Sequence, residues 1–389
     1  MLIKKNKKTS QNCKMVLQYH PQSAIMKRVV EKGSLNELVK LLQFKQSSQV
    51  QYFNPSFFLF NGHLQTIFNP FAALYMKKHN PIKFDREIFE FSDHGTIALD
   101  WVDLNPNKDV YNNKPILAIM PGLTSDNDEI YVLNMLIEAK LRGYQGVVIN
   151  HRGSSGLDLT SPRIYCASSQ DDLREAVNFI VNNYCSSLSR NRQRDIFLVG
   201  NSLGANLLAN YLGEEGQQCP VKAACCVQPP MKIWVFSQTI RNTLYGFYDK
   251  VVAANLKKKF KHFAPGLRDR YKNELGIDID QAIKDVKSSL DLDFTTAKAF
   301  GYESPEDYQH KASCIEKIPA IKTPTFIIMS KDDPLVGGED CIDYEVCKKN
   351  PYVLLGVTHD GGHLGFFSSI LSTKQWHVKP AFDFLDTFK

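Results

Sequence analysis

The pentapeptide Gly200-Asn201-Ser202-Leu203-Gly204 constrains the fold of this chain more than any other stretch. It follows an apolar run at 196–199, which predicts a buried strand, and it precedes a helical pattern at 205–212. A sharp strand-to-helix turn with a serine at the bend is the setting of a G-x-S-x-G nucleophile elbow. Neighbouring backbone crowds the positions two before and two after the serine, so small residues such as glycine fit there. The pentapeptide therefore predicts a nucleophilic Ser202 at the end of a strand.

Apolar strand patterns alternate with helical patterns over most of the chain. A hairpin that turns at Asp93-His94-Gly95 comes first, and buried strands and helices follow it. The predicted strands are at 88–91, 97–99, 116–120, 147–150, 196–199, 221–227, 325–329 and 353–357, and the predicted helices are at 130–142, 171–184, 205–212 and 381–388. This alternation predicts an α/β fold with a mostly parallel, twisted sheet that is flanked by helices on both faces.

Helix-like patterns replace the alternation between Gln228-Pro229-Pro230 and residue 318. A helical insertion late in a parallel sheet predicts a lid over the carboxyl ends of the strands, where such sheets bind ligands. The run NLKKKFKHF at 255–263 suits contact with a lipid surface or a solvated helix whose aromatics pack inward, and the second interpretation is favoured. The predicted organisation is an N-terminal extension at 1–50, a core at 51–229, a helical lid at 230–319 and the rest of the core at 320–389.

The N-terminal extension combines a short basic run with one predicted amphipathic helix. Ser34 and Glu37 have the spacing of a capping box, and leucines at 35, 38, 41 and 42 form an apolar stripe. A membrane-surface anchor and a solvated tail whose helix packs on the body both fit this pattern. One short amphipathic helix is little support for a membrane, which favours the tail. The basic start lacks the apolar stretch of a secretory signal, and no run of about 18 apolar residues predicts a membrane span.

Composition excludes several classes of protein. Hydrophobic residues at 43% and charged residues at 23% are ordinary for a globular chain and exclude a disordered or collagen-like one. The net charge of +6 is mild, and no nucleic-acid recognition motif occurs, so we expect no nucleic-acid partner. The nine cysteines form no C-x-x-C pair and show no metal-ligand spacing, so free thiols, no metal and no cofactor are expected. The predicted location is intracellular, either cytoplasmic or peripherally attached to a membrane.

A serine nucleophile needs a base, and the base needs an acid that orients it. In this kind of fold the acid and then the histidine follow the serine, on loops after late strands. The loop after 325–329 offers Asp332 and Asp333, and the loop after 353–357 offers His359 and His363. Asp333 is preferred because the proline after it fixes the turn, and His363 because flanking glycines let the backbone bend close to the nucleophile. The predicted triad is Ser202, Asp333 and His363, with Asp332 as the alternative acid.

Ester chemistry at a serine also requires backbone N–H groups that stabilise the developing oxyanion. The N–H of Leu203, directly after the nucleophile, is one predicted donor. The second should come from the loop after an early strand, and 121–124 follows the strand at 116–120. Leu123 is the candidate there, because Gly122 allows the turn that would aim its N–H at the site.

Several stretches together resemble the α/β-hydrolases of the ABHD type, a group of lipid esterases that includes the bacterial YheT-like proteins. They are GNSLGA at 200–205, DDP at 332–334, GGHLGF at 361–366, FNGHLQTIF at 60–68, PGLTSD at 121–126 and NHRGSSG at 150–156. The resemblance spans residue 60 to the C-terminus. It implies an α/β-hydrolase fold, a triad of Ser202, Asp333 and His363, and hydrolysis of carboxylic esters, often acylglycerols or phospholipids.

The predicted function is therefore a serine esterase or lipase that works through an acyl-enzyme on Ser202. Its partner would be a lipid or small-molecule ester, with peripheral membrane contact as a further expectation. An ester-forming acyltransferase is the nearest rival function, although the H-x4-D motif of some relatives is missing from the sequence. A non-catalytic lipid-binding relative and an amidase also fit the fold. A retained Ser, Asp and His in order disfavours the lipid-binding relative, whereas the triad alone does not choose between ester and amide.

Overall fold

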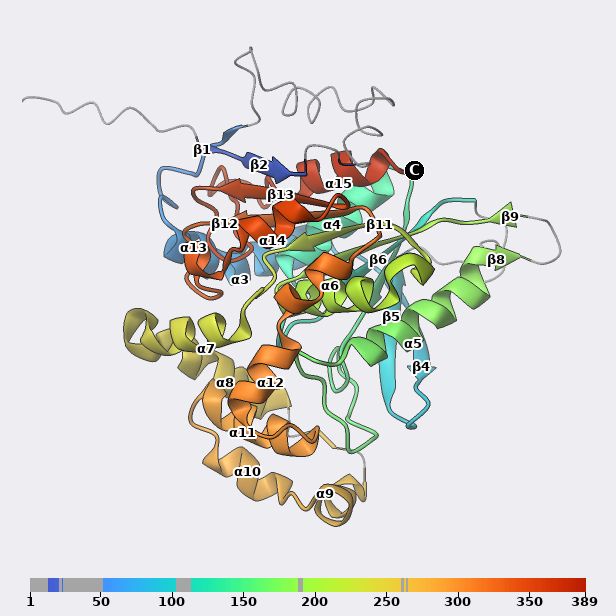
Figure 1. Cartoon of the computed structure of the whole chain (residues 1–389), viewed down its shortest axis with the longest axis vertical. Coiled ribbons are helices and arrows are strands. Elements are labelled where there is room, and N and C mark those ends of the chain that lie inside the picture. Colours follow the sequence, from blue (N-terminus) through green and yellow to red (C-terminus); the bar gives the residue numbers. More distant parts are fainter. Residues whose placement is uncertain are drawn as a thin grey trace, which may run out of the picture.

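The structure is a computed structural model, and it describes residues 13–20, 23, 52–102, 113–187, 192–259, 262–263 and 265–389. Within these residues a nine-stranded sheet forms the centre of the molecule, in the order β2-β13-β12-β11-β10-β6-β7-β5-β4 (Figure 1). The six strands from β13 to β7 run parallel, while β2, β5 and β4 pair antiparallel at the edges. The sheet strands are β2 (Val16–Tyr19), β4 (Phe84–Glu90), β5 (Thr96–Val102), β6 (Ile116–Met120), β7 (Gln145–Ile149), β10 (Ile196–Asn201), β11 (Val221–Val227), β12 (Thr325–Ser330) and β13 (Val353–Thr358).

These strands confirm the predicted fold class, and each predicted strand is present with its bounds shifted by at most a few residues. The central strands β6, β7, β10, β12 and β13 are buried along their whole length, which explains why their sequences are apolar without alternation. The predicted hairpin is the antiparallel pair β4 and β5. Short two-stranded ladders form outside the main sheet, namely β1 (Cys13–Lys14) with β3 (Tyr52–Phe53) and β8 (Ser186–Ser187) with β9 (Arg192–Gln193).

Helices cover both faces of the sheet. Along β6, Ile116 and Ala118 point to a core shared with α5 (Gln170–Ile180) and α6 (Leu203–Glu215), whereas Leu117 and Ile119 point to a core shared with α4 (Ile130–Leu141) and α15 (Val378–Asp386). The predicted helices are confirmed, and α5 ends in a π-helical turn. The helices around the sheet are α3 (Gly62–His79), α4 (Ile130–Leu141), α5 (Gln170–Ile180), α6 (Leu203–Glu215), α13 (Gly338–Cys341), α14 (Tyr344–Lys349) and α15 (Val378–Asp386).

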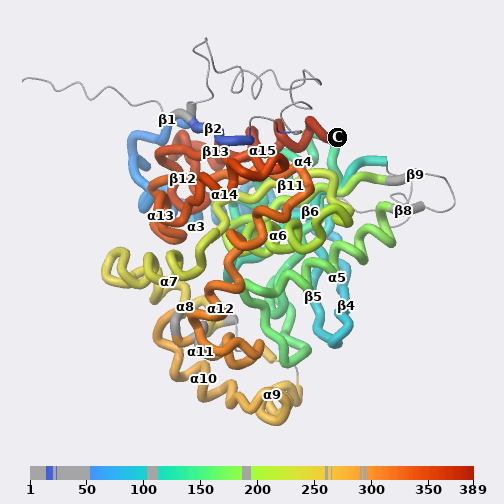
Figure 2. The backbone as a smooth tube through the Cα atoms, viewed as in Figure 1, coloured from blue at the N-terminus to red at the C-terminus, as the bar shows by residue number. Residues whose placement is uncertain are grey.

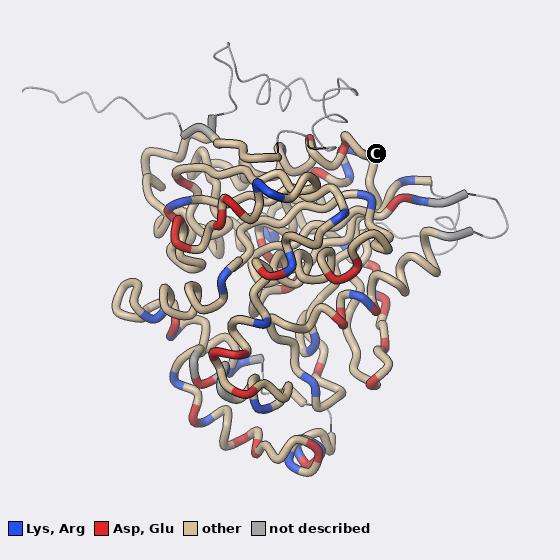
Figure 3. Tube along the Cα trace, viewed as in Figure 1, with Lys and Arg blue, Asp and Glu red and all other residues tan. Residues whose placement is uncertain are grey.

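The segment between β11 and β12 folds as a group of helices beside the carboxyl ends of the strands (Figure 2). Its members are α7 (Ile233–Asn242), α8 (Phe247–Lys259), α9 (Leu267–Leu275), α10 (Ile279–Asp285), α11 (Ser289–Ala299) and α12 (Pro305–Ala312). In the run at 255–263, Leu256 is buried and Phe263 packs on the ring of Tyr271. Basic and acidic residues are interspersed along most elements (Figure 3).

The N-terminal part of the chain differs from the expectation in one respect. Residues 16–19 form β2, which extends the sheet by pairing antiparallel with β13, whereas the sequence predicted no strand there. The predicted amphipathic helix at 34–42 lies outside the described residues.

Candidate active site

The predicted nucleophile lies at the sharp turn between β10 and α6. Ser202 has φ of 53° and ψ of −119°, a strained backbone state that a non-glycine residue keeps only where the surroundings enforce it. A Cβ atom on Gly200 would lie 2.4 Å from the carbonyl oxygen of Gly204, and one on Gly204 would lie 2.4 Å from that of Pro121. This crowding is the physical reason for the two glycines of the G-x-S-x-G pattern.

The structure brings Ser202, His363 and Asp333 together in one hydrogen-bonded chain. The Nε2 of His363 lies 2.9 Å from the Oγ of Ser202, and its Nδ1 lies 2.7 Å from Oδ2 of Asp333. The Asp333 side chain is fully buried, and its Oδ1 accepts the N–H groups of Leu335 and Val336 at 2.9 and 3.0 Å. The three side chains come from loops after β10, β12 and β13, at the same edge of the parallel sheet. The geometry is that of a base placed between a hydroxyl and a fixed carboxylate.

The alternative residues on the same two loops lie elsewhere. Oδ1 of Asp332 accepts the N–H of Gly362 at 2.9 Å, so Asp332 braces the histidine loop instead of contacting the ring. Burial raises the pKa of Asp332 to about 6, and the nearby carboxylates of Asp360 and Asp333 act in the same direction. His359 is exposed, and its Nδ1 lies 3.0 Å from the carboxylate of Asp360.

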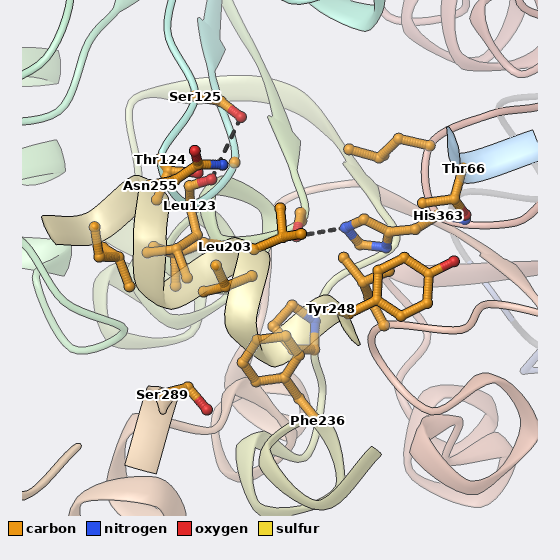
Figure 4. A pocket seen from close by; sticks show the side chains of 18 of the residues that line it. Thr66, Leu123, Thr124, Ser125, Leu203, Phe236, Tyr248, Asn255, Ser289 and His363 are labelled. Carbon is orange, nitrogen blue, oxygen red and sulfur yellow. Dashed lines mark hydrogen bonds between the residues drawn. The ribbon is translucent and has the colours of Figure 1, made fainter. Parts of the chain in front are cut away.

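The two predicted oxyanion donors lie beside the nucleophile. Leu203 begins α6, where the first N–H groups have no partner within the helix. A Cβ atom on Gly122 would lie 3.2 Å from the Cβ of Ser202, so the loop that carries Leu123 runs close to the serine. In Figure 4, Leu123 and Leu203 lie on one side of the cavity and the ring of His363 points toward them.

Buried polar groups hold the loop at 121–124 in place. The N–H of Gly122 donates to the hydroxyl of Tyr131 at 3.2 Å, and the N–H of Thr124 donates to that of Tyr165 at 3.1 Å. Burial raises the pKa of Tyr165 to about 12, so its hydroxyl stays neutral. The amides on both sides of Leu123 are therefore occupied, and among the described residues the Leu123 N–H has no hydrogen-bond partner.

The segment at 150–156 contacts the loop at 121–124 and one of the tyrosines that hold it. Nε2 of His151 lies 3.0 Å from the carbonyl oxygen of Pro121, and its ring stacks on Tyr165 with centroids 4.4 Å apart. The side chain of the next residue, Arg152, is 2% exposed and forms ion pairs with Asp93 and Asp172. Sequence reasoning found this segment only through its resemblance to a family.

Three further side chains position His363, and sequence reasoning did not assign them a role. Oγ1 of Thr66 accepts the His363 N–H at 2.8 Å, and Nδ2 of Asn69 donates to its carbonyl oxygen at 3.0 Å; both come from α3. Gln228 donates to the carbonyl oxygen of Gly362 and accepts the N–H of Leu364, so it grips the loop on both sides of the histidine. Gln228 itself has a φ of 49°, an uncommon backbone conformation for a residue other than glycine, directly after β11.

A cavity of about 480 Å³ opens onto Ser202 and His363. Aliphatic and aromatic side chains from α3, from the loop at 164–167 and from the helices after β11 dominate its lining, among them Ile67, Phe71, Ile164, Ile233, Phe236, Phe247, Val251, Val252 and Leu256. A more polar cavity adjoins it and shares Thr124, Glu129 and Asn255 with it. This second cavity also contains Asp126, Asp158, Lys258 and His262.

Two further kinds of feature are absent from the described residues, namely clusters of metal ligands and helices that could span a membrane. No group of three or more His, Cys, Asp or Glu side chains in the described part of the chain is placed to hold a metal ion. None of the helices formed by those residues is both long and apolar enough to cross a bilayer.

Comparison with known proteins gives consistent matches. The sequence model of the alpha/beta hydrolase fold matches residues 115–369. The chain is 33% identical over 320 residues to embryogenesis-associated protein EMB8 of Picea glauca, covering 79% of this chain and 66% of that protein. It is 28% identical over 336 residues to phospholipase ABHD3 of Homo sapiens, covering 84% and 76%. It is 31% identical over 281 residues to a monoacylglycerol lipase of Saccharomyces cerevisiae, covering 71% and 60%. The chain belongs to the α/β-hydrolase fold family, as its motifs predicted.

Proposed function

We propose that the chain is a serine hydrolase that cleaves carboxylic esters of lipids of the acylglycerol or phospholipid type. The observation that carries this proposal is the hydrogen-bonded chain of Asp333, His363 and Ser202 at an apolar cavity. The names of two relatives, a phospholipase and a monoacylglycerol lipase, support the substrate class.

In this mechanism the Oγ of Ser202 attacks the ester carbonyl while Nε2 of His363 takes its proton. Asp333 keeps the proton of the imidazole on Nδ1 and stabilises the imidazolium that forms. The N–H groups of Leu123 and Leu203 donate to the oxyanion of the tetrahedral intermediate. His363 then protonates the departing alcohol, which leaves the acyl group on Ser202. A water that His363 deprotonates attacks this acyl-enzyme and releases the fatty acid.

The two adjoining cavities fit the two parts of such a substrate. An acyl chain suits the apolar cavity, because burial of each CH₂ group contributes about 0.8 kcal/mol. The alcohol part carries the polar groups of a lipid ester, and the neighbouring cavity offers the carboxylates of Asp126, Glu129 and Asp158 together with the ammonium group of Lys258. Helices α7 and α8 supply much of the apolar wall, and the whole group from α7 to α12 acts as a lid in this proposal.

Labelling with a fluorophosphonate tests the proposal, since this reagent reports an activated serine without a known substrate. The expected result is stoichiometric labelling of the folded chain, with the adduct mapped to Ser202 by mass spectrometry and absent after heat denaturation. A panel of glycerol and p-nitrophenyl esters of increasing chain length should then show hydrolysis. Folded protein that stays unlabelled, or that carries the adduct on another serine, would refute it.

The tyrosines that hold the oxyanion loop lead to a further prediction. Tyr131→Phe and Tyr165→Phe each remove the acceptor of one loop amide, which leaves Leu123 less firmly aimed. Loss of an oxyanion donor itself lowers kcat by about 10²–10³-fold. A Leu123 N–H that is present but less firmly held should therefore lower kcat roughly tenfold, with little change in KM. Tyr144→Phe is the matched control, because its hydroxyl bonds Asp386 away from the loop. An unchanged kcat with a raised KM would mean that the tyrosines only shape the cavity.

A further inference from the structure

Helix α3 presents an apolar stripe to solvent. Ile67, Phe71, Leu74 and Tyr75 are 41, 63, 65 and 58% exposed, and their spacing places them on one face of the helix. The opposite face is also largely apolar and buries Ala72, Ala73 and Met76 against the body. A surface helix ordinarily turns a polar face to solvent, so an exposed apolar stripe of this kind indicates a surface that a binding partner covers.

A second set of exposed apolar side chains lies in the turn at Thr243–Gly246 and in the first part of α8. Leu244, Tyr245, Phe247 and Val251 are 48, 99, 48 and 42% exposed. Leu244 and Tyr245 have positive φ values of 49 and 55°, so the backbone is held in an uncommon turn before α8. The two sets lie near each other, because His63 of α3 contacts Tyr248 of α8 through Nδ1 and the hydroxyl at 2.9 Å.

These two sets border the apolar cavity. Ile67 and Phe71 from α3, and Phe247 and Val251 from α8, line that cavity and are nevertheless at least 41% exposed, so they form its mouth. Leu74 and Tyr75 continue the same surface along α3, and Leu244 and Tyr245 continue it into the turn before α8. We refer to these eight residues together as the apolar rim.

We propose that the apolar rim docks on the surface of a lipid bilayer, from which the lipid ester passes into the cavity. This inference rests on the proposed function. The rim is continuous with the cavity that leads to Ser202, so whatever covers the rim also closes the cavity mouth. A protein in that place would block the substrate, whereas a bilayer supplies it across a path that stays apolar.

The polar groups of the rim suit the same partner. Tyr75 and Tyr245 each combine an apolar ring with a hydroxyl, the combination that is enriched where hydrocarbon meets head groups. Helix α3 ends in Lys77, Lys78 and His79, and Lys250 is exposed on α8; of the three lysines, Lys77 pairs with Asp128 at 2.6 Å. Lysines can extend their charged ends to phosphate groups while the apolar neighbours enter the acyl region. The surface thus has an apolar centre with two exposed lysines, Lys78 and Lys250, beside it.

Pelleting with phosphatidylcholine vesicles tests the docking. The parent protein carries Ser202→Ala, so that no lipid is hydrolysed during the assay. The triple variant Leu74→Glu, Tyr75→Glu, Tyr245→Glu places charges on the rim but leaves the residues that line the cavity intact. We expect its vesicle partition coefficient to fall at least about tenfold. Leu141→Glu and Ile88→Glu, at positions 76 and 52% exposed away from the rim, are the controls and should change it less than about twofold.

A second measurement separates this inference from the proposed function. In the chain that keeps Ser202, the triple variant should hydrolyse a water-soluble short-chain ester like the wild type, but lose about tenfold on an ester embedded in vesicles. Failure of the wild type on soluble esters would count against the proposed function and not against docking, since pelleting needs no catalysis. Equal pelleting of the triple variant and its parent would overturn the docking. So would a dimer, detected by light scattering, that the triple variant dissociates, because a second copy would then be the occupant.

Discussion

Replacing Asp333 by asparagine is expected to lower kcat about 10⁴-fold, whereas the same change at Asp332 is expected to lower it less than tenfold. The two carboxylates are neighbours in the sequence and lie on one loop, but only Oδ2 of Asp333 contacts Nδ1 of His363. An amide at position 333 can present its NH₂ group to that nitrogen. The imidazole would then carry its proton on Nε2, where it cannot accept the proton of Ser202.

Asp332→Asn removes the carboxylate charge but keeps a hydrogen-bond acceptor for the loop that carries His363. Asparagine keeps an oxygen that can accept the N–H of Gly362, so His363 should stay in place. The measurement is kcat on a soluble ester for both variants, with circular dichroism to show that each is folded. A large loss at Asp332 and a small one at Asp333 would assign the acid to Asp332, the alternative that sequence reasoning had left open.

The arrangement around Ser202 was predictable because each part has a local cause. The strands that carry the triad are buried on both faces, which makes 196–199, 325–329 and 353–357 continuous apolar runs. Gly200 and Gly204 are required by backbone atoms within 2.4 Å of where their side chains would begin. The choice of Asp333 over Asp332 rested on its position four residues past the predicted strand at 325–329, on the proline after it and on the family resemblance. None of these shows which carboxylate turns toward a ring.

The walls of the site were not predictable, because their causes are distant in the sequence. Helix α3 has apolar residues on its exposed face and a proline inside, so it lacks the periodic pattern of a surface helix. Gln228 marked only the end of the alternation, although it bonds a loop more than a hundred residues further on. Strand β2 has four residues and is fixed by its pairing with β13, which no local pattern specifies.

The second large effect is expected in stability, at the buried ion pair beneath the oxyanion loop. Asp172→Ala should lower the free energy of unfolding by about 3 kcal/mol, the lower end of the usual cost of removing one partner of a buried ion pair, because Asp93 still pairs with Arg152. Asp172 accepts from Nε and Nη2 of Arg152 at 2.7 and 2.9 Å, and the Arg152 side chain is 2% exposed over the ring of Phe91. Asp93 pairs with Nη1 of the guanidinium, so its other two bonded nitrogens would lose their acceptors.

Asp171→Ala is the matched control for this change. Asp171 precedes Asp172 in the first turn of α5, so both alanine variants lose a similar interaction with the helix dipole, about 0.3–1 kcal/mol. Its side chain is 53% exposed and pairs with Arg174 and Arg163, a surface arrangement that contributes about 0–1 kcal/mol. Urea denaturation should therefore separate the two variants by roughly 2–3 kcal/mol. Equal losses would show that Arg152 finds other acceptors when Asp172 is gone. His151, which contacts the carbonyl oxygen of Pro121, is next to Arg152 in the chain. Equal losses would therefore also mean that the position of His151, and of the loop that carries Leu123, does not depend on the ion pair between Arg152 and Asp172.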